Sequence, residues 1–208
     1  AADNTTSGAN NVAIGAYALD ANTTAGSNTA VGKSALAANT TGAEGVAIGA
    51  NALDANTTGN NNVGIGYSSL GVNTTGGSNV AVGSYALDAN TTASDNVAVG
   101  HHSLGTNTTG TQNTAIGKGS LFANTTAGNN TAVGFEALNA NTTGANNVGV
   151  GAGALATNVD GSRSTAIGRL ALNTQEPASA TDMHNTAVGY GAGQSVTTGT
   201  HNTIIGSE

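Results

Sequence analysis

A five-residue block that returns every 17 residues is the feature that most constrains this chain. The block reads Asn-(Val/Thr)-Ala-(Ile/Val)-Gly and first occurs at Asn11–Gly15. Copies begin at residues 11, 28, 45, 62, 79, 96, 113, 130, 147 and 164, and two more follow at 185 and 202. The single longer step is 21 residues, and its four extra residues fall within the segment 175–184. A strict period of this kind predicts a solenoid of stacked, nearly identical units.

The pattern inside each repeat indicates strands rather than helices. Counting from the Asn as position 1, position 4 is Ile or Val and position 5 is Gly in all twelve copies, and position 9 is Leu in ten of eleven. β-branched residues alternate with small ones, as in a strand, and the Gly marks a bend. Helical repeats need more than about 30 residues per unit. The sequence therefore predicts an all-β fold, a parallel β-roll or β-solenoid of about twelve 17-residue coils forming one repeat domain over 1–208, with 175–184 as a loop.

We expect the large aliphatic residues at positions 4 and 9 to fill a thin interior, because few other large side chains are present. Only 3% of the residues are aromatic and 7% are charged. The predicted core residues are Ile14, Leu19, Val31, Leu36, Ile48, Leu53, Ile65, Leu70, Val82, Leu87, Val99, Leu104, Ile116, Leu121, Val133, Leu138, Val150, Leu155, Ile167, Leu172, Val188 and Ile205. The Ala or Gly at position 3 would then form a flat outer row. Such a row suits packing against another copy of the chain, so we expect self-association as a homotrimer or filament.

Two rows of Asn at positions 1 and 12 are expected to form ladders, with each side-chain amide bonding the next. The Asn at position 12 opens an Asn-Thr-Thr sequence, which is also an acceptor for N-glycosylation. The candidate glycosylation sites are Asn4, Asn22, Asn39, Asn56, Asn73, Asn90, Asn107, Asn124 and Asn141. The alternative is a turn in which Asn and Thr bond nearby backbone groups, and it explains the spacing equally well.

The quoted blocks resemble the head repeats of trimeric autotransporter adhesins of the YadA type. Asn-Thr-Ala-Val-Gly at Asn28–Gly32 and Asn-Val-Ala-Ile-Gly at Asn11–Gly15 carry the resemblance, which covers essentially the whole chain. It implies a left-handed, homotrimeric parallel β-roll at a cell surface. The repeat departs from the family's usual length of about 14 residues, and no coiled-coil heptads or membrane anchor are present. The longer form with Asn-Thr-Thr-Gly is also similar to repeats of phage tail-fibre-like proteins.

Few residues suggest chemistry. Asp20, Asp54 and Asp88 share one repeat position in alternate coils, too far apart to hold one calcium ion. The pair His101-His102 indicates a solvated face, and His184 and His201 are expected to stack near each other. We predict no catalytic residue, metal site or cofactor, and hence no enzyme, because nucleophile and phosphate-binding motifs are missing. The net charge of −7 argues against nucleic acid, and no run of 18 apolar residues indicates a membrane span.

The leading functional hypothesis is a structural or adhesive rod segment of an extracellular fibre or surface adhesin. Its partners would be copies of the chain and host-surface, matrix or glycan ligands, and its location a cell or virion surface. Alternatives of the same class are a phage tail-fibre shaft and a subunit of a self-assembling, glycosylated filament. An ice-binding β-solenoid is the alternative from another class, because regular ranks of Thr can order water.

Overall fold

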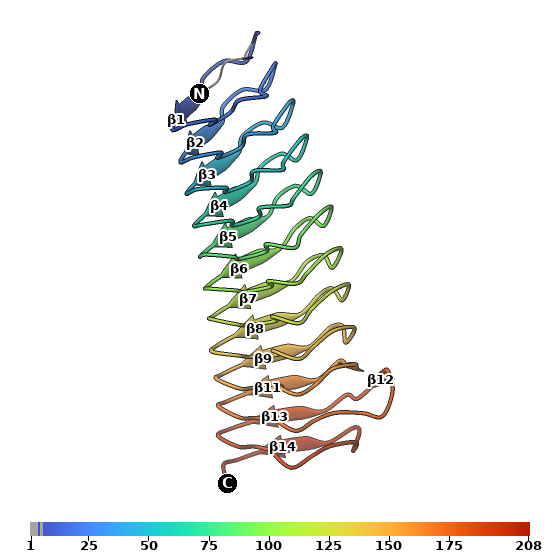
Figure 1. The fold of residues 1–208 in the computed structure, drawn as a ribbon. Helices are drawn as coiled ribbons and strands as arrows, with labels where there is room; N and C mark the ends of the chain where they lie inside the picture. The colour runs from blue at the N-terminus through green and yellow to red at the C-terminus, as the bar shows by residue number, and fades with distance from the viewer. Residues whose placement is uncertain (1–3, 5) are drawn as a thin grey trace. The chain divides into compact units, whose positions relative to one another are not determined.

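The computed structural model describes residue 4 and residues 6–208, in which every regular element is a strand. The chain forms two compact units, Ala1–His102 and Ser103–Glu208. Both are parallel β-solenoids with coils of about 17 residues, and about eleven turns are present in all. Within each unit the strands lie one above another on one side of the coils (Figure 1). The predicted all-β parallel solenoid with 17-residue coils is therefore confirmed, with about eleven turns where about twelve coils were expected.

Unit 1 contains one three-residue strand per coil. These are β1 (Val12–Ile14), β2 (Thr29–Val31), β3 (Val46–Ile48), β4 (Val63–Ile65), β5 (Val80–Val82) and β6 (Val97–Val99). Consecutive strands pair in parallel with a shift of 17 residues, as in Val46↔Val63. The register follows from the repeat, because equivalent residues lie opposite each other in every pair.

Unit 2 contains a similar sheet and one additional short strand pair. Its strands are β7 (Thr114–Ile116), β8 (Thr131–Val133), β9 (Val148–Val150), β10 (Gly161–Ser162), β11 (Thr165–Ile167), β12 (Thr181–Asp182), β13 (Thr186–Val188) and β14 (Thr203–Ile205). Strand β12 lies within the inserted segment and pairs with β10 outside the main sheet. Figure 1 shows β12 on the part of the coil that bulges outward. The main sheet passes the insertion with Thr165 opposite Thr186. The register of the main sheet therefore resumes beyond the insertion, and two residues of the segment predicted as a loop, Thr181 and Asp182, form strand β12.

The inner and outer faces of the strands are the reverse of the predicted ones. The Ala at position 3 is fully buried, as at Ala47 and Ala115, whereas Ile48 and Ile116 at position 4 are each 40% exposed. The position-4 residues Ile14, Val31, Ile48, Ile65, Val82, Val99, Ile116, Val133, Val150, Ile167, Val188 and Ile205 all lie on the outer face, exposed or half-buried. The predicted core is thus wrong for these residues. Only a methyl group or a hydrogen fits where the strand faces the narrow interior.

The ten Leu residues at position 9 are the true apolar core, and each is at most 1% exposed. Every one adopts a left-handed backbone conformation, with φ between 47° and 52°. That conformation costs roughly 1–2 kcal/mol for a residue with a Cβ. Burial of the side chain offsets the cost, and the backbone N–H bonds the neighbouring coil, as from Leu36 to the Ala52 carbonyl at 3.0 Å.

The exception at position 9 is compensated by a second exception in the next coil. Gly193 replaces Leu and keeps the left-handed conformation, with φ 63°. Ile204 replaces the inward Ala at position 3, and a Cβ on Gly193 would lie 2.9 Å from its Cδ1. The large side chain has therefore moved from one wall of the interior to the other, and the space stays filled.

The Gly at position 5 has a positive φ and also lies close to the backbone of the next coil. Gly49 has φ 132°, and a Cβ there would lie 2.5 Å from the Gly66 carbonyl oxygen of the next coil. A side chain would therefore be strained and would also clash with the neighbouring backbone.

Candidate functional site

The buried Asn row at position 12 forms a continuous side-chain ladder within each unit. In unit 1, Asn73 Nδ2 donates to Asn56 Oδ1 at 2.9 Å and to the Gly76 carbonyl at 2.9 Å. In unit 2, Asn141 Nδ2 donates to Asn124 Oδ1 at 3.0 Å. The predicted ladder at position 12 is confirmed, and it satisfies amides that would be costly to bury alone.

The ladder contradicts N-glycosylation at eight of the nine candidate sites. Asn22, Asn39, Asn56, Asn73, Asn90, Asn107, Asn124 and Asn141 are each at most 2% exposed. A glycan must be joined to the same Nδ2 atom that faces the interior and bonds the adjacent coil. Asn4 is the exposed exception. The Asn-Thr-Thr turn is thus a structural motif in these coils, as the alternative reading predicted.

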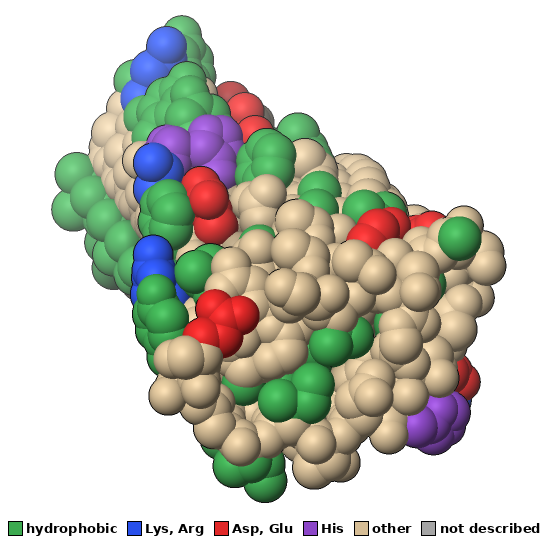
Figure 2. All heavy atoms as spheres, turned by 90° about the horizontal axis from the view of Figure 1, so that it is seen from below, with side chains coloured by type: hydrophobic (Ala, Val, Ile, Leu, Met, Phe, Trp, Pro, Cys, Tyr) green, Lys and Arg blue, Asp and Glu red, His purple; other side chains and the backbone are tan. Residues whose placement is uncertain are grey.

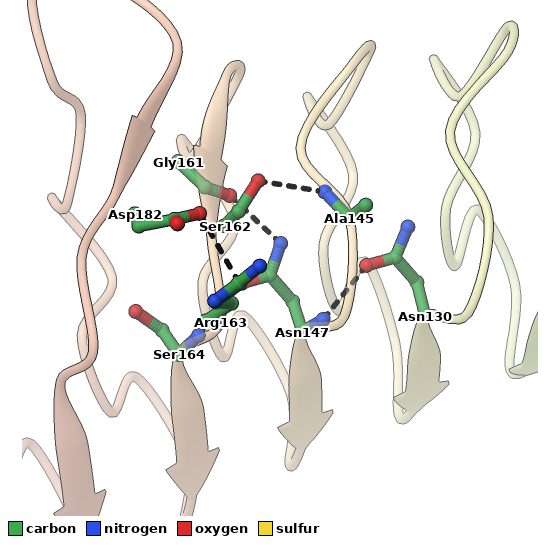
Figure 3. Close-up of polar contacts among 8 residues, drawn as sticks. All are labelled: Asn130, Ala145, Asn147, Gly161, Ser162, Arg163, Ser164 and Asp182. Atoms are coloured by element: carbon green, nitrogen blue, oxygen red, sulfur yellow. Dashed lines mark hydrogen bonds and ion pairs between the residues drawn. The ribbon is translucent and has the colours of Figure 1, made fainter.

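The Asn row at position 1 bonds differently from the predicted amide-to-amide ladder. Asn130 Oδ1 accepts the backbone N–H of Asn147 at 2.9 Å, and Asn147 Nδ2 donates to the Gly161 carbonyl at 2.8 Å (Figure 3). At most steps the side-chain carbonyl oxygen faces a main-chain donor of the next coil. Amide-to-amide bonds of the predicted kind join Asn96 Nδ2 to Asn79 Oδ1 at 3.4 Å and Asn202 Nδ2 to Asn185 Oδ1 at 3.0 Å.

The inserted segment keeps the interior continuous. Gln175 occupies the place of the ladder Asn, is fully buried, and donates from Nε2 to Asn158 Oδ1 at 3.0 Å. Next to it, Arg163 pairs with Asp182 at 3.3 Å on the surface (Figure 3). Both side chains are about half exposed, so this ion pair adds little stability.

The first candidate surface is the strand face, which we define as the outward side chains at positions 2 and 4 of each unit. All are Val, Ile or Thr, so the strand face has no charged side chain in either unit. Its residues are exposed or half-buried in every strand. Because this surface is regular, apolar and built on a hydrogen-bonded sheet, it can pack against another flat surface.

The second candidate surface is the corner row, which we define as positions 6 and 7, just after the conserved bend at position 5. It holds all four Tyr, three of the four Lys and Arg, and two of the four His. Its members are Ala16, Tyr17, Lys33, Ser34, Ala50, Asn51, Tyr67, Ser68, Ser84, Tyr85, His101 and His102 in unit 1, and Lys118, Gly119, Phe135, Glu136, Ala152, Gly153, Arg169, Leu170, Tyr190, Gly191, Ser207 and Glu208 in unit 2. The row varies strongly between otherwise similar repeats, and solenoids commonly bind partners through such surfaces.

Aromatic contacts order the corner row in unit 1. The rings of Tyr67 and Tyr85 meet edge to face at 5.3 Å, and Tyr85 stacks on His102 at 4.9 Å. His101 packs against His102 at 4.2 Å. The His pair therefore belongs to an aromatic cluster, which the sequence did not indicate, because these residues lie 16 to 18 positions apart.

Cations pair with aromatic rings in the corner row of unit 2. Lys118 Nζ lies 5.8 Å from the ring centre of Phe135, and Arg169 lies 5.6 Å from that of Tyr190. In Figure 2, which looks onto the C-terminal end, Lys and Arg side chains lie next to hydrophobic ones along one corner, with acidic groups beside them. Elsewhere in this unit, His184 and His201 stack at 5.0 Å, as predicted.

Two carboxyl groups of unit 1 have perturbed acidity. Burial raises the pKa of Asp54 above its ordinary value of 3.8. Burial also raises the pKa of Asp88, and the nearby His102 opposes the increase. Within residue 4 and residues 6–208, no three His, Asp or Glu side chains gather in a way that could hold a metal ion. In the same residues no helix is long and apolar enough to span a bilayer.

In comparisons with known proteins, no family model, curated protein or solved structure matches the chain.

Proposed function

We propose that the chain is a structural, adhesive rod segment of an extracellular fibre or surface adhesin, and that its copies associate through the strand face. The observation that carries the proposal is the absence of charge from the strand face of both units, although its residues are exposed or half-buried. Contiguous apolar patches above a few hundred Å² usually mark an interaction site.

The size of the strand face supports association with a second copy. The uncharged residues of this face follow one another through every main strand of a unit, and a standard interface buries about 800 Å² per partner. The interior adds a reason: its large apolar side chains amount to about one Leu per coil, with Met183 in addition, which is little against the entropy of ordering a coil. The buried Ala row cannot be the interface first expected, so the contact moves to the opposite face of the same strands.

The resemblance to adhesin head repeats supports a left-handed coil and a homotrimer as the finer form of the proposal. A phage tail-fibre shaft and a self-assembling filament would use the strand face in the same way. The location would be a cell or virion surface, and partners beyond the chain itself would be host-surface, matrix or glycan ligands. The proposal assigns no catalytic role, because the sequence offers no nucleophile–base motif.

Sedimentation equilibrium of the full chain tests the proposal. We expect a species of about three times the 19.8 kDa chain mass. Ile48→Lys combined with Ile116→Lys places a charge on each strand face and should dissociate it. Thr58→Lys with Thr126→Lys, on the exposed turn, is the matched control. A concentration-independent monomer, or dissociation by the control pair alone, would contradict the proposal.

Ice binding is a second candidate that one observation favours. In unit 2, five of the six main strands begin with Thr, and each of these is two residues from an outward Ile or Val. The strand face of unit 2 is therefore a regular array of hydroxyl and methyl groups. Thermal hysteresis of the purified full chain would support this function, and its absence would rule it out.

A further inference from the structure

A recess interrupts the corner row of unit 2 where two small residues stand between larger ones. Ala152 and Gly153 occupy the positions that carry Phe135 and Glu136 in the preceding coil and Arg169 and Leu170 in the following coil. The resulting hollow has a volume of about 220 Å³. Pockets for drug-sized ligands span roughly 300–1,000 Å³, so this recess suits a single ring rather than an extended molecule.

The two facing walls of the recess are an aromatic ring and a guanidinium group. Lys118, from the coil before, covers one side of the Phe135 ring, so the opposite side faces Ala152. Arg169 is held from the coil after, where a guanidinium nitrogen lies 3.0 Å from the Tyr190 hydroxyl. A guanidinium carries five N–H donors, so this one bond leaves further donors for a ligand. Both walls are therefore ordered before a ligand arrives, which lowers the entropic cost of binding.

The floor of the recess is fixed, and one acid and one cation are among its lining residues. Asn173 Nδ2 donates to the Gly153 carbonyl at 2.8 Å. Gly153 has φ 67°, and a Cβ there would lie 2.8 Å from Leu170 Cδ2, so only glycine leaves the floor open. Glu136 also lines the recess, and its Cγ would lie 3.4 Å from a Cβ on Gly119 in the preceding coil. Arg169 is the cation among the lining residues.

We propose that this recess binds one acidic sugar ring of an anionic polysaccharide. The apolar C–H face of a pyranose would stack on Phe135, and its carboxylate would pair with Arg169, whose planar fork matches carboxylate geometry. The inference goes beyond the proposed fibre function, because the site lies within one chain and on a different surface from the strand face. It assigns a ligand class to the corner row of unit 2.

Isothermal titration of the full chain with a trimer of galacturonic acid tests the site, with maltotriose as the neutral probe. Ala152→Tyr fills the hollow with a side chain that this position carries in other coils, at Tyr67 and Tyr190. Ala50→Tyr makes the same change at the equivalent position of unit 1 and is the matched control. Arg169→Gln removes the cation.

We expect the acidic trimer to bind and the neutral one not to. Ala152→Tyr and Arg169→Gln should each weaken binding roughly tenfold, the change that about 1.4 kcal/mol produces, and Ala50→Tyr should leave it unchanged. Absence of binding, equal binding of maltotriose, or equal loss in Ala50→Tyr would overturn the assignment. Repeating the titration on the Ile48→Lys, Ile116→Lys variant separates this result from self-association, because that variant leaves the recess intact.

Discussion

The strand faces of the two units have the same backbone but different chemistry at position 2. In unit 1 the first outward residue is Val in five of six strands, with Thr29 as the exception. In unit 2 it is Thr in five of the six main strands, with Val148 as the exception. Val and Thr have nearly the same shape, and both favour strands. The polarity of this face can therefore change while the coil beneath it stays the same.

The fold requires the interior residues that both units share, whereas the outward residues at position 2 can differ between the units. In both units the interior consists of Leu, Ala and bonded Asn, and the outward strand positions vary only within one shape class. The Val methyl groups make the strand face of unit 1 the more apolar one for association. The Thr hydroxyl groups allow the strand face of unit 2 to bond water as well. Equivalent interior substitutions should accordingly change the unfolding free energy equally in the two units, whereas the two strand faces should differ in their contribution to association.

Breaking the Asn ladder should give the largest effect, and the same effect in either unit. Asn56→Ala leaves Asn39 and Asn73 without their shared amide, and Asn124→Ala does the same to Asn107 and Asn141. We expect each change to cost about 3 kcal/mol of unfolding free energy, because buried partners are left unsatisfied. Urea unfolding of the two variants measures it.

The exposed turn provides the control for the ladder. Thr58→Ala and Thr126→Ala remove solvent-facing hydroxyls two residues after the ladder positions and should change stability by less than about 0.5 kcal/mol. Unequal losses for Asn56→Ala and Asn124→Ala would show that the two interiors are not equivalent.

Exchanging the two face types should change association without changing the fold. Replacing Val46, Val63, Val80 and Val97 with Thr gives unit 1 the chemistry of unit 2. We expect self-association to weaken at least about tenfold, because each change puts a hydroxyl where a methyl was buried on contact. The reverse change, Thr114, Thr131, Thr165 and Thr186 to Val, should strengthen it. Sedimentation measures both, and unchanged association in both sets would mean that the strand face is not the interface.

The pH dependence of stability should differ between the units, because position 10 carries Asp54 and Asp88 in unit 1 but Asn139 and Asn173 in unit 2. Burial raises the folded-state pKa of both Asp side chains, so their share of stability is present below pH 3.8 and is lost as pH rises through the raised values. The melting temperature of the wild-type chain should therefore fall as the pH rises through that window. The double variant Asp54→Asn, Asp88→Asn should show a smaller fall.

The Asn residues of unit 2 suggest a further gain from the same substitutions. Asn139 and Asn173 donate to the carbonyls of Gly119 and Gly153, 20 residues earlier. An Asn at position 88 would find the Ser68 carbonyl at the equivalent place, which should add about 0.5–1 kcal/mol at neutral pH. Asp20→Asn is the control, because no residue lies 20 positions before it. A gain in that control as large as in Asp88→Asn would rule out the hydrogen bond.

Filling the one vacancy in the position-1 row of unit 1 should give the smallest effect. Gly45 stands where neighbouring coils have Asn, and a Cβ there would lie 3.0 Å from Asn28 Oδ1, a tight but adjustable contact. Gly45→Asn supplies an acceptor for the backbone N–H of Asn62, as Asn62 does for Asn79 at 2.9 Å. We expect a gain of about 0.5–1 kcal/mol in urea unfolding. Gly45→Ala separates this gain from the loss of backbone freedom, and equal effects of the two changes would contradict it.

The repeat predicted the strands, their register, the bend at position 5 and the bonded Asn row at position 12. It did not predict which face of the strand is buried, because alternation defines two faces without saying which is inside. The sequence did contain a signal. Position 2 alternates between Val and Thr, as an exposed site allows, while position 3 stays Ala or Gly until Ile204. In a narrow interior, the size of the inward side chain at position 3 is restricted more strongly than its hydrophobicity.

Two features of the candidate sites lay beyond the sequence. The left-handed Leu at position 9 could not be foreseen, since that conformation is unfavourable for Leu in general and is stabilised here by burial and by bonds to adjacent coils. The recess beside Ala152 depends on which residues become neighbours 17 positions apart. Its position could be inferred from the aligned repeats.

The way in which the chain accommodates its insertion has a practical consequence for protein engineering. Gln175 continues the amide ladder across the lengthened coil, and the main sheet resumes at Thr186 in unchanged register. Foreign peptides placed between residues 178 and 180, which are exposed, would start and end on a coil that already tolerates extra length. We expect this exposed turn to be a suitable grafting point, because the interior beneath it stays continuous.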